Sequence, residues 1–175
     1  MKTIDYNASL DHSSRAITAL VFLLFILLGY FLVRIITHSH GNLMTILFPS
    51  GLLFILFCLL TLASYFLAPQ SYKLDSLNLT IVRRAKDKVI KLADIIEVRN
   101  VDYEMNRAIR LIGVGGLFGY FGKHYALKIG AVTVYASQRK NRILIQTIQG
   151  QKIIITPDDD ISMLEQLKEL MKTKS

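Results

Sequence analysis

The sequence predicts a transmembrane helical hairpin followed by a small antiparallel β-barrel or sandwich of about seven strands, capped by a C-terminal α-helix. Three observations support this fold class. Two long apolar runs lie within the first 68 residues. The remaining residues alternate between short apolar runs and polar turns, and the last segment has the pattern of an amphipathic helix. Short strands followed by one helix, within about one hundred residues, suit a closed or layered β-structure.

Composition divides the chain into two parts. Of 175 residues, 52% are hydrophobic, and most of this excess lies between Ala16 and Ala68. The formal net charge is +8. Residues 1–72 contain three basic and two acidic side chains, whereas residues 73–175 contain eighteen basic and eleven acidic side chains. The basic character therefore belongs to the C-terminal part, where it can act on a partner surface. Cys58 is the only cysteine, which excludes an intramolecular disulfide.

The first apolar run predicts a membrane-spanning helix over about residues 16–36. The eighteen residues from Ala16 to Val33 contain no charged side chain. At ~1.5 Å per residue, such a helix nearly covers a ~30 Å hydrocarbon core, and flanking arginines can reach the polar interfaces. A cleaved signal peptide is the competing interpretation, but the polar segment before the run is long and Arg34 follows it directly. We therefore expect a retained anchor.

The second apolar run predicts a second helix over about residues 45–68, which completes the helical hairpin. Pro49 lies near its start, where the first turn of a helix accepts a proline. The nineteen residues from Ser50 to Ala68 are enough to span a bilayer. Between the helices we expect a polar turn over residues 37–42, whose two histidines lack a nearby carboxylate or thiol to complete a metal site.

Positive charge near the membrane predicts that both termini are cytoplasmic. Lysine and arginine close to membrane ends are retained on the cytoplasmic side. The predicted N-terminal tail, residues 1–15, carries two of them, and six more follow the second helix: Lys73, Arg83, Arg84, Lys86, Lys88 and Lys91. The predicted linker, residues 69–71, is so short that the domain after it, residues 72–175, stays at the bilayer surface.

Short apolar runs in this domain predict strands. Alternation of apolar and polar residues over Leu77–Val82 is typical of a half-buried strand. Further strands are expected at residues 88–92, 95–101, 108–112, 125–129, 132–136, 143–147 and 152–155. Gln149-Gly150 indicates a compact β-hairpin.

The last element should be an amphipathic helix. Thr156 can cap it, Pro157 fits its first position, and Asp158 to Asp160 place negative charge at the positive end of the helix dipole. One apolar stripe should cover the open end of the sheet, and it consists of Ile161, Leu164, Leu167 and Met171.

Four sequence segments resemble bacterial pleckstrin-homology-like (PH-like) domains. They are Arg110 to Gly113 (RLIG), Gly115 to Gly122 (GGLFGYFG), Val134 to Ser137 (VYAS) and Thr156 to Asp159 (TPDD). The resemblance covers roughly residues 72–170 and implies a PH-like fold. Such proteins are commonly small and membrane-anchored, with a transmembrane hairpin beside the domain. The resemblance therefore implies a multi-pass protein of the bacterial inner membrane, but it does not transfer the lipid binding of eukaryotic PH domains.

The Gly-rich segment Gly115–Gly122 has two interpretations. Its spacing is not that of a phosphate-binding P-loop, because Leu117 stands where the first glycine is needed and His124 where Ser or Thr is needed. In the favoured interpretation the glycines allow tight turns and the aromatic residues fill the barrel. In the other, Phe118, Tyr120 and Phe121 point outward and contact lipid or a membrane-protein partner.

Two basic clusters are further candidate contact residues. They comprise Arg83, Arg84, Lys86, Lys88 and Lys91 at one predicted turn, and Arg139, Lys140 and Arg142 at another. A solvated basic surface is the plain interpretation. The functional one is contact with anionic lipid headgroups, worth on the order of 1 kcal/mol per basic residue near the surface. The stretches lack a nucleic-acid-binding motif, and we expect no nucleic-acid partner.

Catalytic chemistry has little support in the sequence. His124 is the only histidine of the domain, no cysteine accompanies it, and the capping role explains the acidic run at Asp158. Arg107 and Arg110 are expected to pair with acids such as Asp102 and Glu104. We expect no enzyme activity, cofactor or metal. The leading hypothesis is a membrane-tethered protein-interaction or scaffolding module, and the alternative is a domain that senses anionic lipids.

Overall fold

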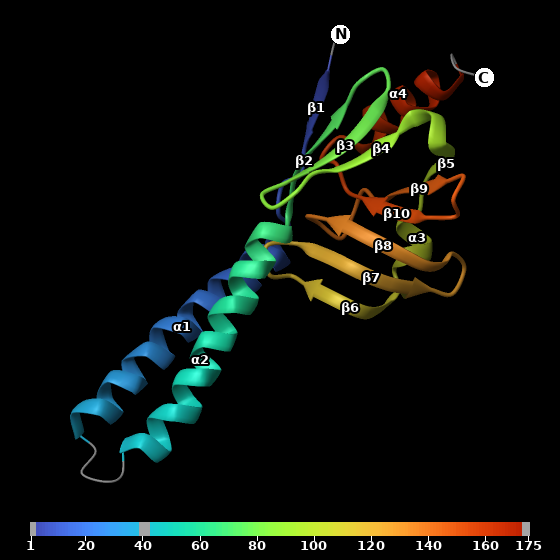
Figure 1. The fold of residues 1–175 in the computed structure, drawn as a ribbon. Coiled ribbons are helices and arrows are strands. Elements are labelled where there is room, and N and C mark those ends of the chain that lie inside the picture. The colour runs from blue at the N-terminus through green and yellow to red at the C-terminus, as the bar shows by residue number, and fades with distance from the viewer. Residues whose placement is uncertain (1–2, 39–42, 173–175) are drawn as a thin grey trace.

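Two long helices form a stalk that projects from a β-rich body in the computed structural model, which describes residues 3–38 and 43–172 (Figure 1). Helix α1 spans His12–His38 and helix α2 spans Leu43–Leu67. Within them, His12–Thr37 and Phe48–Leu67 are long and apolar enough to cross a membrane. Large apolar side chains along both helices are exposed, as lipid-facing side chains would be. Of the predicted turn between the helices, residues 39–42 lie outside the described residues.

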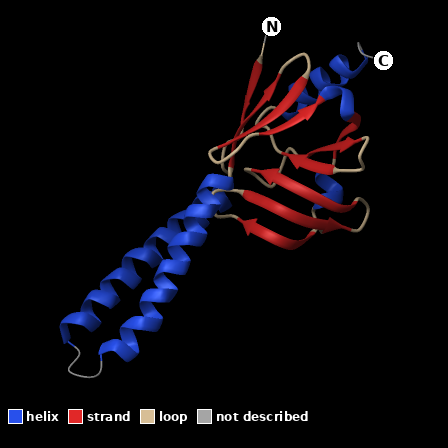
Figure 2. Ribbon diagram, in the orientation of Figure 1, coloured by secondary structure: helices blue, strands red, loops and turns tan. Residues whose placement is uncertain are grey.

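The described strands form two sheets that pack face to face (Figure 2). The first has the order β1-β2-β3-β4 and comprises Ile4–Asn7, Pro69–Leu74, Asn78–Arg83 and Lys88–Lys91. The second has the order β5-β9-β10-β8-β7-β6. In chain order, its strands are Ile95–Asn100, Ile109–Gly115, Tyr120–Ala126, Gly130–Ala136, Ile143–Thr147 and Lys152–Ile155. All pairings are antiparallel except that of β8 with β10. The predicted sandwich with a C-terminal helix is confirmed, although it has more strands than the expected seven.

Strand β1 lies in the segment that the sequence indicated to be a tail. It pairs antiparallel with β2, and Tyr6 stands opposite Tyr72. Tyr6 and Ala8 are buried. The segment expected to be a linker, residues 69–71, belongs to β2. The helical hairpin is therefore an insertion between two paired strands of the body. Four alternating residues in a polar segment were too few to indicate this strand from sequence.

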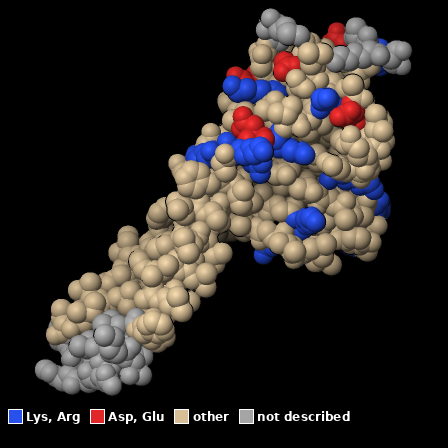
Figure 3. Space-filling model, in the orientation of Figure 1, with Lys and Arg blue, Asp and Glu red and all other residues tan. Residues whose placement is uncertain are grey.

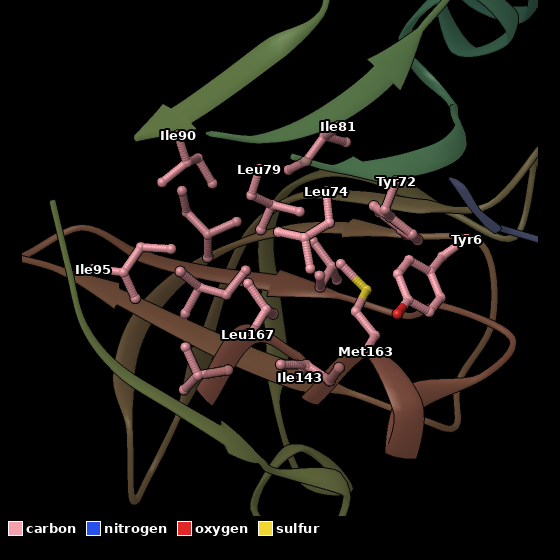
Figure 4. Packing of buried hydrophobic residues seen from close by; sticks show 14 of the residues in the cluster. Tyr6, Tyr72, Leu74, Leu79, Ile81, Ile90, Ile95, Ile143, Met163 and Leu167 are labelled. Carbon is pink, nitrogen blue, oxygen red and sulfur yellow. The ribbon is translucent and has the colours of Figure 1, made fainter. Parts of the chain in front are cut away.

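The main hydrophobic core lies between the two sheets (Figure 4). Strands β2 and β3 contribute fully buried side chains such as Tyr72 and Leu79, and β9 and β10 contribute Ile143 and Ile155. Helix α4, Asp160–Lys172, closes one side of this core with Met163 and Leu167. The amphipathic helix thus covers the core as expected, but Ile161 of the predicted stripe is exposed.

Helix α4 begins later than the sequence indicated. Thr156 does not cap it, because the Thr156 Oγ1 atom is buried and accepts the backbone N–H of Ser137 at 3.0 Å. The capping group is Asp159, whose Oδ1 accepts the N–H of Ser162 at 3.1 Å. Asp158 instead binds Ser9 in the segment after β1.

A second hydrophobic cluster covers the outer face of the six-stranded sheet. The short helix α3, Asp102–Met105, contributes Met105, and β8 and β10 contribute Val134 and Ile154. The 3-10 turn η1, Leu92–Asp94, joins the two sheets. The six-stranded sheet is therefore covered by apolar side chains on both faces along its middle strands.

Candidate functional site

The turn between β6 and β7 rests on the first turns of helix α1. Ser14 Oγ donates to the carbonyl oxygen of Gly116 at 2.6 Å, and the Phe118 N–H donates to Thr18 Oγ1 at 3.1 Å. The Phe118 ring meets Phe22 and Tyr65 edge-on, with ring centroids 6.3 and 5.3 Å apart. This turn thus contacts both helices of the stalk.

Glycine is required at two positions of this turn. Gly116 has a φ of 110°, and a Cβ there would overlap the Ile17 side chain of α1. Gly119 has a φ of 130°, and its Cβ would lie 2.7 Å from the carbonyl oxygen of Ala136. Side chains are strained at such φ values, so larger residues would disturb the contact with the stalk.

The aromatic candidates of the Gly-rich segment lie in different places. Tyr120 and Phe121 are buried residues of β7 rather than turn residues. Phe118 is half-buried and reaches the stalk. The segment is thus mainly structural, and its one outward-reaching aromatic side chain meets the helices of the same chain.

Asp11 joins the stalk to two other elements. Its Oδ1 accepts the Ser14 N–H at 2.7 Å, which caps α1 and explains why this helix begins earlier than expected. The carboxylate also accepts the Tyr120 hydroxyl and, at 3.2 Å, the Arg139 N–H. Burial, followed by the negative charge of Asp11, raises the pKa of Tyr120 above its ordinary value.

The turn between β3 and β4 lies against the end of α2. The Arg84 guanidinium stacks 4.0 Å from the Tyr65 ring centroid, and the Ala85 N–H donates to the Phe66 carbonyl oxygen at 3.0 Å. Arg83 stacks on Tyr135 at 5.2 Å. The other basic candidates of this cluster are Lys86, which is exposed at the turn, and Lys88 and Lys91 at the two ends of β4. Basic side chains gather beside the top of the stalk in the space-filling view (Figure 3).

The connection between β8 and β9 carries the second basic cluster. The Arg139 guanidinium lies over the Tyr120 ring at 5.0 Å, and Lys140 is exposed. Arg142 is half-buried, and its Nη1 donates to the Asp102 carbonyl oxygen at 3.3 Å and to Asn106 Oδ1 at 3.2 Å. Burial lowers the pKa of Arg142. Members of both basic clusters thus lie next to the stalk, with Arg84 beside the end of α2 and Arg139 beside the start of α1.

The expected ion pairs of Arg107 and Arg110 are wrong. Glu104 pairs with Arg99 instead, with Nη1 and Oε1 2.5 Å apart, and this contact lowers the pKa of Glu104. The Asp102 carboxylate accepts the backbone N–H groups of Asn141 and Arg142. Arg110 instead stands beside His124 on the neighbouring strand, a pairing that depends on the β6–β7 register and has no local sequence signal.

Comparison with protein-family models identifies residues 70–171 as a bacterial PH domain. Comparison with curated proteins and with solved structures found no match. The matched segment extends from β2 to α4 and includes both basic clusters, whereas β1 and the stalk lie outside it. Because this match covers more than half of the sequence, the chain belongs to the bacterial PH domain family.

Proposed function

We propose that the chain is an integral membrane protein whose PH domain recruits another integral membrane protein, as an interaction or scaffolding module. The main observation that supports this proposal is the unpaired edge of the six-stranded sheet. Strand β6 is the last strand of that sheet. Its residues Ile109, Leu111 and Ile112 are 66%, 57% and 73% exposed. An exposed apolar edge strand presents unpaired backbone groups and apolar side chains to an incoming strand.

The other sheet edges are less suited to this role. Strand β5 packs against helix α4, and β1 has only four residues. Strand β4 carries lysine at both of its ends, a common protection against strand pairing. Strand β6 has a bulge between Arg110 and Ile112, but at seven residues it is the longest edge strand and it carries three exposed apolar side chains. It is therefore the edge that best accepts an extended segment of a partner.

The stalk determines what kind of partner can reach this edge. The turn that follows β6 contacts Ile17 and Thr18 of α1, inside the apolar span. A partner strand on β6 would therefore lie at the membrane surface, which favours an apolar extended segment beside a transmembrane helix. We further propose that both termini face the cytoplasm, because the basic clusters adjoin the same end of the stalk. The proposal assigns no reaction, cofactor or metal to the chain.

Site-specific photocrosslinking of the full-length protein in its native membrane tests this proposal. A photoreactive residue at Ile112 should give a discrete crosslinked protein band. Ile148, at the tip of the β9–β10 hairpin and 65% exposed, is the matched control and should give none. When the photoreactive residue is placed at a second position of β6, the added substitution Ile112→Lys should reduce the amount of crosslinked protein. Equal crosslinking at both positions, or crosslinking to lipid alone, would contradict the proposal.

Contact with anionic lipid is the second candidate function, because both basic clusters adjoin the ends of the helices. The exposed side chains Lys86 and Lys140 are the cations best placed for it. After detergent extraction, a Lys86→Glu/Lys140→Glu variant should retain at least twofold less anionic lipid than the wild-type protein. Mass spectrometry measures the retained anionic lipid relative to neutral lipid. A Lys168→Glu/Lys172→Glu variant on α4 makes the same charge change away from the stalk and should retain the wild-type amount. Equal retention by both variants would rule out this function.

A further inference from the structure

A hollow of about 270 Å³ lies on the outer face of the six-stranded sheet, next to α3. Apolar side chains of β8 and β10 line one part of it, among them Val134 and Ile154. The other part is lined by polar side chains from β6, β7 and the β8–β9 connection: Arg110, Tyr120, His124, Gln138, Arg139 and Arg142. Neither the family match nor the proposed partner strand accounts for this concentration of cations in a concave site.

The absence of a side chain at Gly115 creates space above β6. Gly115 lines the hollow, and a Cβ there would overlap the Arg110 guanidinium. Unlike Gly113 and Gly116, Gly115 does not have a positive φ, so the backbone conformation does not require glycine at this position. Its absent side chain leaves room for the guanidinium of Arg110 to lie along the sheet within the hollow.

None of the three guanidinium groups is held in an ion pair with a described residue, although the charge of Asp102 acts on Arg142 and raises its pKa against the effect of burial. Within residues 3–38 and 43–172, Arg110, Arg139 and Arg142 form no ion pair with an acidic side chain. Nearby Asp11 accepts backbone N–H groups and the Tyr120 hydroxyl. Among the described residues, the hydrogen bonds of the Asp102 carboxylate come from the backbone N–H groups of Asn141 and Arg142. Arginine matches the geometry of phosphate oxygens in paired hydrogen bonds, and three in one hollow suit a group with more than one negative charge.

His124 provides a further polar group, which interacts with the Gly122 backbone but has one nitrogen without a partner in the described part of the chain. Its Nδ1 is buried and has no hydrogen-bond partner among the described residues. It stands opposite Arg110 in the β6–β7 register. Burial first, and then the positive charges of Arg110 and Arg142, lower the pKa of His124. A bound anion would relieve this repulsion and could accept a hydrogen bond from the imidazole.

We propose that this hollow is a binding site for a phosphate group, with Arg110, Arg139 and Arg142 as its cationic ligands and His124 as an additional donor. The phosphate belongs either to a soluble compound or to a lipid headgroup. A lipid source fits the geometry, because Gln138 and Arg139 also line a neighbouring hollow of about 500 Å³ beside residues 10–13 at the start of α1. This site lies on the opposite face of β6 from Ile112, so it is independent of the proposed partner strand.

The test uses the full-length protein in phosphatidylcholine nanodiscs, with the ring signals of His124 followed by NMR. Inorganic phosphate is one probe, and nanodiscs containing phosphatidic acid are the other. We expect a saturable shift of the His124 signals with at least one probe. A response to inorganic phosphate indicates a soluble ligand, and a response to phosphatidic acid alone indicates a lipid headgroup.

Three variants distinguish specific binding in this hollow from general electrostatic attraction between the protein and anions. Arg110→Gln should weaken the response about tenfold, the equivalent of one charge-assisted contact. Lys168→Gln removes the same charge from α4, away from the stalk, and should leave the response unchanged. Gly115→Ala keeps every charge but displaces the Arg110 guanidinium, and it should weaken binding as well. The proposal is overturned if neither probe shifts His124, or if Arg110→Gln and Lys168→Gln weaken binding equally.

Discussion

The two faces of the six-stranded sheet differ in what their side chains do. On the inner face, Ile153 and Ile155 of β10 are almost completely buried against the first sheet and helix α4. On the outer face, apolar packing covers β8 and β10 but gives way to the hollow over β6 and β7, with Arg110 and His124 in it. One sheet thus supplies a stabilising core on one side and, on the other, a hollow whose arginines form no ion pair among the described residues. The difference teaches that one sheet can bury apolar side chains over β8 and β10 while β6 and β7 place polar groups in an open hollow.

The largest difference in stability between the two faces is expected for substitutions at two neighbouring residues of β10. Ile155→Ala should destabilise the domain by about 4 kcal/mol, because it leaves a cavity in close-packed surroundings. Ile154→Ala should cost about 2 kcal/mol, because Ile154 borders the hollow and water can enter the vacated space. Chemical denaturation of the two variants in detergent measures both values. Equal losses would mean that the outer face is packed as tightly as the inner one.

High pH should act on the core that the inner face covers, through Tyr72 of β2. Burial raises the pKa of Tyr72 to about 12, and the Tyr72 hydroxyl donates to the Tyr135 carbonyl oxygen at 2.8 Å. The unfolded state ionises near pH 10, whereas the folded state keeps the proton until about pH 12, so stability is full below pH 10 and falls between these values. The loss should total about 3 kcal/mol. Denaturation between pH 9 and about pH 12 measures it, and Tyr72→Phe should reduce the slope.

Low pH should act through the outer face, with a smaller effect. The pKa of His124 is lowered by burial and then by Arg110 and Arg142, so the folded state resists protonation. Stability should therefore be full above pH 6.5, the ordinary value, and decline as the pH falls through the lowered pKa. Arg110→Gln should raise the pKa of His124, measured by NMR titration, and change the free energy of unfolding at pH 8 by less than about 0.5 kcal/mol. A marked destabilisation there would show that Arg110 has a structural role.

Local patterns in the sequence predicted the long apolar helices, most strands and the amphipathic helix α4. These features follow from periodicity within one element, which each segment carries by itself. The missed features depend on partners that are distant in the chain. Strand β1 becomes recognisable only when β2 lies beside it, and Thr156 loses its capping role because Ser137 approaches it.

The candidate residues of the two basic clusters were visible as charge runs, but their different surroundings were not. Arg84 stacks on an aromatic ring of the stalk, whereas Arg142 lines a hollow together with Arg110 from β6. The hollow depends on the absence of a side chain at Gly115 and on the register that brings His124 beside Arg110. Neither feature has a signal in the local sequence, which explains why Arg110 was assigned to the wrong partner.

The insertion of the stalk between β1 and β2 has a consequence for biosynthesis. Ile4 pairs with Leu74, so the first strand leaves the ribosome well before its partner and must wait while both helices are made. The four-stranded sheet can close only if both ends of the stalk emerge on the same side of the bilayer. A chain whose helices insert incorrectly would leave the β2 edge uncovered and Tyr72 without its neighbour Tyr6. If both helices cross the membrane as proposed above, this sheet is therefore complete only in chains whose two stalk ends lie on the same side.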